Sequence, residues 1–309
     1  MSKLILSKKQ IQLLIGKYTI QIFNKTIGLS HYFLPDNMEQ FLIDCKKEDS
    51  LFAAKNNMEY NIQLTTPFVE PEDKPIAGFD QGPYPYSIYR INSGGYLWIR
   101  KNQDMQPKLV YQISEDWNTW SLLLDNSPNS GSDSFSELAY IFAYSVLNKG
   151  GIMFHGVVMQ WEGMGIIICG HSGIGKTTHT RMWKDSENAK ILNGDRALCY
   201  KKESIWYTSG APWSGSSGEY SSKCAELKAV VILEQAEVNE IEVLPPLKGA
   251  LELIQLAFAP AWDDKLINCS FDAIDDIAQN IQVLKLRCQP NLDAVSVLKA
   301  GLEELLAAI

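Results

Sequence analysis

Apolar side chains in the middle of the chain form short runs that turn sequences separate from one another. Residues 86–91 and 96–100 are rich in aromatic and β-branched side chains, and the sequence Asn-Ser-Gly-Gly at 92–95 lies between them. This arrangement predicts a β-hairpin. Similar runs at 109–113 and 120–124 extend it, so the sequence predicts a β-meander.

A helix is predicted to follow a polar segment. Residues 125–134 are rich in Asn, Ser, Gly and Pro, which is typical of a connection between domains. Ser134 and Glu137, three residues later, form a capping-box pattern, and apolar residues then recur on one face as far as Val146. The sequence Asn-Lys-Gly-Gly at 148–151 ends the predicted helix.

Strands and helices are predicted to alternate in the second half of the chain. Continuous apolar runs at 152–158, 165–169, 191–192 and 229–233 are candidate buried strands. A last helix with one apolar face is expected at 292–309. Alternation of this kind favours an α/β domain. The expected organisation is a β-rich α+β domain at 1–130, whose first 80 residues predict no defined element, and an α/β domain at 131–309.

Composition narrows the classes of function. The 309 residues carry a formal net charge of −8, with 46% hydrophobic and 21% charged residues, as in a soluble globular protein. The acidic balance argues against a nucleic-acid or anionic-membrane partner, because no basic excess is available to neutralise phosphates. No run approaches the roughly 18 apolar residues of a membrane span. Lys8 and Lys9 interrupt the apolar N-terminus, so no signal peptide is expected. Six cysteines without a CxxC pair favour a cytoplasmic location, with Cys169 and Cys199 as core residues.

The strongest motif is a phosphate-binding loop. Residues 170–177, Gly-His-Ser-Gly-Ile-Gly-Lys-Thr, match the pattern G-x-x-x-x-G-K-[ST] between a candidate buried strand and a candidate helix. The glycines let backbone N–H groups point at phosphate oxygens, and the helix adds its positive N-terminal end. The sequence therefore predicts binding of ATP or another nucleoside triphosphate. The predicted nucleotide-binding residues are Gly170, Ser172, Gly173, Ile174, Gly175, Lys176, Thr177 and Thr178.

A triphosphate site also needs an acid that holds Mg²⁺ together with the Thr177 hydroxyl. Asp195 follows the short apolar run Ile-Leu-Asn-Gly, about 20 residues after Lys176, and the intervening helix can return it to the neighbouring strand. Glu234 follows a longer apolar run, and its alternative role is a surface acid that ends a core strand. We favour Asp195 as the metal ligand.

These residues together resemble a known family. The order of His155-Gly156, the phosphate loop and the sequence ILNGDR at 191–196 is similar to the catalytic domain of HPr kinase/phosphorylase, a family that shares its core with ATP-dependent phosphoenolpyruvate carboxykinases. The sequence GAPWSG at 210–215 resembles a subgroup that includes lasso-peptide kinases of peptide-modification clusters. The resemblance starts near Ser134 and runs to the C-terminus. It implies a P-loop kinase domain of the α/β class.

The resemblance also implies roles for individual residues. Lys176 matches the phosphate-binding lysine, Thr177 the metal-holding hydroxyl residue, and His155 the active-site histidine of the family. Asp195 matches the second of two adjacent acids that serve metal binding and general-base catalysis. Gly194 replaces the first acid, so Asp195 is expected to serve both roles, or to share them with His155.

Several other side chains have two interpretations. The Ser- and Gly-rich segment 214–222 is expected to be a flexible loop that receives the second substrate, or else an ordinary connection. Arg196 and Lys223 are candidates for neutralising phosphate charge, or else surface charges, and Arg287 is expected to face the site or else to pair with an acid. The acid pair Asp263-Asp264 is expected to be solvated or to cap a helix.

The function predicted from these residues is an ATP- and Mg²⁺-dependent kinase acting on a serine-type hydroxyl of a peptide or protein. A small-molecule kinase differs only in the size of its acceptor. A carboxykinase fits poorly, because few arginines are available for a dicarboxylate. A nucleotide-gated binding protein without efficient catalysis stays open because of Gly194. Under the kinase interpretation the N-terminal domain docks the acceptor, and the oligomeric state is left open, an oligomer included.

Overall fold

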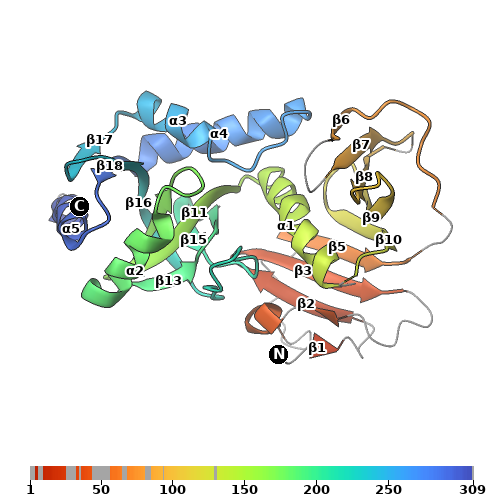
Figure 1. The fold of residues 1–309 in the computed structure, drawn as a ribbon, viewed down its shortest axis with the longest axis horizontal. Coiled ribbons are helices and arrows are strands. Elements are labelled where there is room, and N and C mark those ends of the chain that lie inside the picture. Colours follow the sequence, from red (N-terminus) through yellow and green to blue (C-terminus); the bar gives the residue numbers. More distant parts are fainter. Residues whose placement is uncertain are drawn as a thin grey trace. The chain divides into compact units, whose positions relative to one another are not determined.

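The chain forms a mixed α/β structure with two large sheets and, in the described residues, five α-helices (Figure 1). The computed structural model describes residues 4–5, 10–25, 33–34, 36–43, 56–64, 68–80, 85–92, 94–128 and 131–307. It divides into two compact units. The first contains Met1–Lys149 and Pro260–Asp264, and the second contains Gly150–Ala259 and Lys265–Ile309.

The first unit is built on an eight-stranded sheet with the strand order β2-β3-β5-β10-β9-β8-β7-β6. A separate pair, β1 and β4, and the short 3-10 helix η1 complete its small elements. The bounds are β1 Leu4–Ile5, β2 Gln10–Ile15, β3 Tyr18–Asn24, β4 Phe33–Leu34, η1 Asp36–Phe41, β5 Asn57–Ile62, β6 Ala77–Phe79, β7 Tyr86–Arg90, β8 Tyr96–Lys101, β9 Pro107–Ile113 and β10 Thr119–Asp125.

The predicted β-meander is confirmed. Strands β7, β8, β9 and β10 pair in chain order, each antiparallel to the next. In β10 buried and half-buried residues alternate strictly, as expected for a strand with one face on a core. The predicted hairpin has Tyr86 opposite Arg100 and Arg90 opposite Tyr96.

Helix α1, Ser132–Leu147, packs on this sheet in the first unit. Trp120 Nε1 donates to the Ser145 hydroxyl over 3.0 Å, and the Tyr111 hydroxyl donates to the Ser134 carbonyl over 2.6 Å. The helix ends before Asn148, as predicted, but the capping box is wrong. Gly131 is the N-cap, and the Ser134 hydroxyl donates to the Gly131 carbonyl inside the first turn.

The boundary of the compact units lies at residue 149, whereas the sequence predicted a domain boundary at 130. The difference is helix α1, which belongs to the first unit. The short segment Pro260–Asp264 also belongs there. Its Asp263 is buried and accepts a hydrogen bond from the Tyr96 hydroxyl, so the prediction of a solvated Asp263 is wrong.

The second unit is built on a mixed sheet with the order β12-β11-β14-β15-β16-β18-β17. Strand β13 pairs with β11, and β12 also pairs with β16, so five strands close into a ring. The bounds are β11 Ile152–Trp161, β12 Met164–Cys169, α2 Lys176–Glu187, β13 Lys190–Asn193, β14 Arg196–Lys202, β15 Ile205–Ser209, β16 Cys224–Gln235, β17 Glu240–Val243, α3 Pro246–Ile254, α4 Asp264–Asn280, β18 Gln282–Cys288 and α5 Leu292–Ala307.

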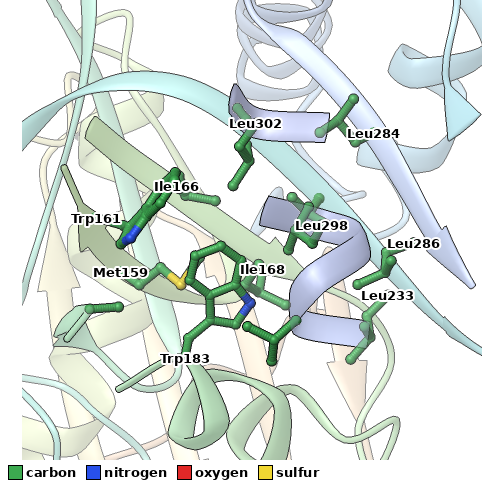
Figure 2. Packing of buried hydrophobic residues seen from close by; sticks show 14 of the residues in the cluster. Met159, Trp161, Ile166, Ile168, Trp183, Leu233, Leu284, Leu286, Leu298 and Leu302 are labelled. Carbon is green, nitrogen blue, oxygen red and sulfur yellow. The ribbon is translucent and has the colours of Figure 1, made fainter. Parts of the chain in front are cut away.

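Strand β12 and its neighbours form the apolar centre of this unit. All six residues of β12 are buried, and the strand runs antiparallel to β11 and parallel to β16. Helices α2 and α5 close the core, with Trp183 fully buried from α2 and Leu298 from α5 (Figure 2). The predicted core positions of Cys169 and Cys199 are confirmed. This packing fixes where β12 ends and where α2 begins, and the phosphate loop lies between them.

No helix in the described part of the chain combines the length and the apolar character that crossing a membrane requires.

Candidate functional site

The loop between β12 and α2 has the backbone geometry that its glycines allow. Gly170, Gly173 and Gly175 have φ angles of +149°, +80° and +109°, a region that side chains with a Cβ rarely adopt. A Cβ on Gly173 or Gly175 would have no atom within 4 Å, so the space beside both residues is open. Helix α2 starts directly after Gly175. The loop therefore presents an open backbone concavity at a helix N-terminus, which is a favourable place for an anion.

The Lys176 side chain spans this loop from its far end. Its ammonium donates to the carbonyl oxygens of Gly170 over 2.7 Å and of His171 over 3.0 Å. Lys176 is only 8% exposed, and burial lowers the pKa of the ammonium, while the charge of Asp195 acts in the opposite direction. An ammonium group has three donors, so these two bonds leave one for a ligand oxygen.

The other predicted nucleotide-binding residues line the loop and the first turn of α2. Ser172 and Thr178 are exposed, and Ile174 and Thr177 are half-buried. The Ile174 carbonyl accepts a hydrogen bond from Gln235 over 3.3 Å, which ties the loop to the end of β16.

Two side chains anchor the inner face of α2. Trp183 Nε1 donates to Nε2 of His179 over 3.1 Å, and both side chains are buried. His179 therefore accepts as a neutral imidazole, and burial lowers its pKa to about 4. The Thr180 hydroxyl donates to the Lys176 carbonyl over 3.0 Å. These contacts give His179 a structural role in the packing of α2.

Asp195 lies in a tight turn between β13 and β14 that one amide organises. Asn193 Oδ1 accepts from the backbone N–H of Asp195 over 2.9 Å and of Arg196 over 2.7 Å. Its Nδ2 donates to the carbonyl oxygens of Ala211 over 2.8 Å and of Trp213 over 3.1 Å. Asn193 was missed as a functional residue, although an Asn two residues before the key acid is a typical turn signal.

His155 and Asp195 come together as the sequence predicted. The sheet brings them close, because β11 pairs with β14 and places His155 opposite Arg196, the neighbour of Asp195. His155 Nδ1 lies 3.3 Å from Asp195 Oδ1, and Arg196 Nε lies 3.5 Å from Asp195 Oδ2. The Arg196 guanidinium also lies over the Phe258 ring, 5.1 Å from its centroid.

The charges of these groups act on one another. Burial lowers the pKa of His155, the charges of Lys176 and Arg196 lower it further, and the Asp195 carboxylate raises it. The imidazole is therefore neutral near pH 7 and can donate its Nδ1–H to Asp195. The charge of Lys176 acts on His155, and that of Asp195 acts on Lys176, so the loop lysine and the aspartate turn face a common region.

The Ser- and Gly-rich segment folds as a turn against Asp195. The Ser217 hydroxyl and N–H both donate to the Ser214 carbonyl, over 2.6 and 3.2 Å. A Cβ on Gly215 would lie 2.8 Å from the Asp195 carboxyl carbon, so this glycine touches the carboxylate directly. Gly194 N–H donates to the Glu219 carbonyl over 3.0 Å. Segment 214–222 was expected to receive the second substrate or else to be an ordinary connection. No sequence signal identified the contact of Gly215 with Asp195.

Gly194, where an acid was expected from the resemblance, has no room for a side chain. A Cβ at this position would lie 2.1 Å from the Ser217 hydroxyl oxygen and 2.4 Å from the Ser217 Cβ. The Ser217 side chain therefore occupies the volume next to Asp195 that a longer residue at 194 would need.

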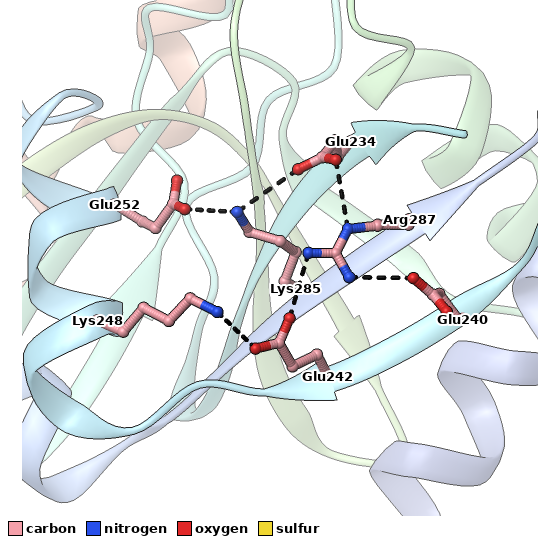
Figure 3. A network of polar contacts seen from close by, with 7 residues as sticks. All are labelled: Glu234, Glu240, Glu242, Lys248, Glu252, Lys285 and Arg287. Carbon is pink, nitrogen blue, oxygen red and sulfur yellow. Dashed lines mark hydrogen bonds and ion pairs between the residues drawn. The ribbon is translucent and has the colours of Figure 1, made fainter.

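Glu234, the second candidate acid, belongs to an ion-pair network at the ends of β16 and β18 (Figure 3). Its carboxylate lies 3.5 Å from Lys285 Nζ and 3.3 Å from Arg287 Nε. Arg287 also contacts Glu240 and Glu242, at 3.0 and 3.3 Å. Arg287 thus pairs with acids, one of its two predicted roles. Glu234 is engaged by two cations, whereas Asp195 faces the region of Lys176.

The chain is similar to one family of known sequence and to solved structures. The sequence model of a family described as "ScmC: SynChlorMet cassette protein ScmC" matches residues 133–290, about half of the chain, a range that contains the loop and Asp195. A search of curated proteins gives no match. Among solved structures, the Hpr(Ser) kinase/phosphatase from Coxiella burnetii is similar at 10% identity and a TM-score of 0.31, over 50% of this chain and 93% of that chain. A TM-score of this size carries no argument about function.

Proposed function

This chain belongs to the SynChlorMet cassette protein ScmC family, and from the site within the matched range we propose that it is an ATP- and Mg²⁺-dependent kinase acting on a serine-type hydroxyl of a peptide or protein. One observation carries the proposal. A buried lysine spans an open glycine loop at a helix N-terminus, and the charges of this lysine and of the Asp195 carboxylate both act on His155.

The loop fits a triphosphate. The space beside Gly173 and Gly175 is open, and the backbone there adopts positive φ angles. Lys176 is held by two carbonyl oxygens and has one donor left for a phosphate oxygen. A glycine loop followed by a lysine binds phosphate through backbone N–H groups and the point charge of the ammonium. Lys176 and the loop N–H groups would hold the β- and γ-phosphates.

The residues also fit Mg²⁺ in the manner usual for nucleotide sites. Within the described residues, no cluster of three His, Cys, Asp or Glu side chains could hold a metal ion. Mg²⁺ keeps several waters and takes one or two protein oxygens together with substrate phosphates, so a full cage is not required. The Thr177 hydroxyl and the Asp195 carboxylate would provide the protein oxygens. Bound Mg²⁺ would neutralise phosphate charge.

The acceptor hydroxyl would meet the Asp195 carboxylate. The carboxylate would orient this hydroxyl and accept its proton as the hydroxyl oxygen bonds to the γ-phosphorus, while the bond between that phosphorus and the bridging oxygen breaks and ADP leaves. Neutral His155, whose Nδ1 lies 3.3 Å from Asp195 Oδ1, would help to hold the carboxylate in place. Arg196 adds positive charge on the other oxygen. Phosphoryl transfer gains mainly from positioning and charge neutralisation, so one carboxylate is sufficient for the chemistry.

The test is transfer from γ-labelled ATP with Mg²⁺ to peptides that carry an accessible serine, with alanine counterparts as controls. Asp195→Asn keeps the shape and removes the base, so we expect the rate to fall by about 100-fold or more while the affinity for ATP measured without Mg²⁺ changes little. Asp185→Asn, which alters an exposed acid on α2, is the matched control.

Two outcomes decide between the proposal and its alternatives. Label on serine peptides that depends on Asp195 supports the kinase. Tight ATP binding without transfer to any peptide or small hydroxyl compound would overturn the proposal and favour a nucleotide-gated binding protein, for which the missing acid at Gly194 is the structural argument.

A further inference from the structure

The Asn193 side chain joins two segments of the site that are distant in sequence. It is fully buried, and its amide makes four hydrogen bonds. The oxygen accepts from the N–H groups of Asp195 and Arg196, and the nitrogen donates to the carbonyls of Ala211 and Trp213. Both donors and two acceptor sites of the amide are used, so no other residue type of this size can replace it.

The two ends of the amide control different sides of Asp195. The oxygen holds the backbone from which the carboxylate projects. The nitrogen holds the chain immediately before the turn at 214–217, whose Gly215 touches that carboxylate. A shift of the 211–213 segment would therefore move Gly215 toward or away from Asp195. Because Ser217 fills the volume over Gly194, the turn has little freedom to compensate.

On the basis of the proposed function, we propose that Asn193 is a positioning residue that fixes the Asp195 carboxylate relative to the 214–217 turn, so that an acceptor hydroxyl reaches it in one geometry. Asn193 does not touch the reacting atoms. It fixes the distance between the Asp195 carboxylate and the 214–217 turn. A displacement of about 1 Å at such a site lowers the rate by about 100-fold.

Two variants separate the two ends of the amide. Asn193→Asp keeps an acceptor for the Asp195 and Arg196 N–H groups and loses both donors, whereas Asn193→Ala loses all four bonds. Thr208→Val is the matched control, because it removes one buried hydrogen bond of the same unit, from the Thr208 hydroxyl to the Leu198 carbonyl.

The first measurement is amide hydrogen exchange at residues 195 and 196 in the full chain, without nucleotide or acceptor. We expect both amides to keep slow exchange in Asn193→Asp and to exchange at least about 10-fold faster in Asn193→Ala, because only the second variant removes their acceptor. Unchanged exchange in Asn193→Ala would overturn the inference even if the chain transfers no phosphate.

The second measurement is the kinetic split. In Asn193→Asp we expect kcat to fall about 10-fold or more while the Kd for ATP stays within about 2-fold, because Lys176 and its loop are not altered. A kcat no lower than that of Thr208→Val, or an equal loss in ATP affinity, would show a merely structural role. A wild-type chain without any transfer overturns the proposed function instead.

Discussion

The phosphate loop and the aspartate turn both depend on glycine, but for opposite reasons. In the loop, Gly173 and Gly175 adopt φ angles of +80° and +109° and have open space where a Cβ would be. In the turn, a Cβ on Gly194 would lie 2.1 Å from the Ser217 hydroxyl oxygen and would collide with it. The loop needs glycine for backbone conformation, and the turn needs it for space.

This difference decides what each region can do. An open loop with inward N–H groups can accept a ligand without moving a side chain. The turn is filled by its own chain, and only the carboxylate edge of Asp195 is left for a substrate. Glycine at a loop with open space and glycine beside a carboxylate held by its own chain therefore need different packing.

The largest expected effect is the loss of Lys176. We predict that Lys176→Ala lowers phosphoryl transfer by about 1,000-fold, because the variant removes the point charge at the phosphates from a partly desolvated site. Nucleotide affinity should fall with it, in contrast to Asp195→Asn. Transfer rates with γ-labelled ATP and binding by calorimetry measure both quantities.

The control for this prediction is Lys190→Ala, which removes an exposed lysine of β13. It should change neither rate nor affinity. If Lys176→Ala retained wild-type affinity and rate, the loop would not be the phosphate site, and the functional contrast between loop and turn would be lost.

A second prediction concerns the helix that carries the loop. His179 has a pKa of about 4 in the folded chain because of burial, against an ordinary value of 6.5. The unfolded chain therefore takes up a proton first as pH falls. The contribution of neutral His179 to the free energy of unfolding is fully present above pH 6.5. It is lost as the pH falls from 6.5 to 4, and the total loss is about 3 kcal/mol.

Urea unfolding at pH 7 and pH 4.5, in a chelating buffer, tests this assignment. His179→Gln should lose less stability than the wild type over that interval, because glutamine can accept from Trp183 without titrating. His171→Gln, which removes an exposed loop histidine, is the matched control. Equal pH dependence in the wild type and His179→Gln would contradict the assignment.

The elements with strong local patterns were predictable from the sequence. The meander of β7 to β10 and the buried strands β11, β12 and β16 lie where their apolar runs stand, with ends that differ by a few residues. Helix α4 was not predicted, although Leu266, Ile274 and Ile277 recur at helical spacing and are buried.

The parts that depend on partners from elsewhere in the chain were not predictable. Ser134 was predicted to cap α1, yet Gly131 with a φ of +83° starts the helix and leaves the hydroxyl inside it. Asp263 appeared in a polar pair of acids, and Tyr96 from a distant strand makes its burial tolerable. The phosphate loop was recognisable because its demands are local. The packing of Ser217 over Gly194 involves residues 23 positions apart, which no local pattern encodes.

The smallest expected effect tests the two uses of glycine directly. Gly194→Ala should destabilise the chain by about 2 kcal/mol, because the new Cβ overlaps Ser217 in a packed turn. Gly173→Ala should destabilise it by about 1 kcal/mol through backbone strain alone. Adding Ser217→Gly removes the overlap, so it should restore much of the loss in Gly194→Ala and none of it in Gly173→Ala. Urea unfolding of the wild type, the three single variants and the two double variants forms two double-mutant cycles. Equal coupling of Ser217→Gly to both substitutions would show that the two glycines do not differ in kind, whereas coupling confined to residue 194 would establish space as the reason for glycine beside Asp195.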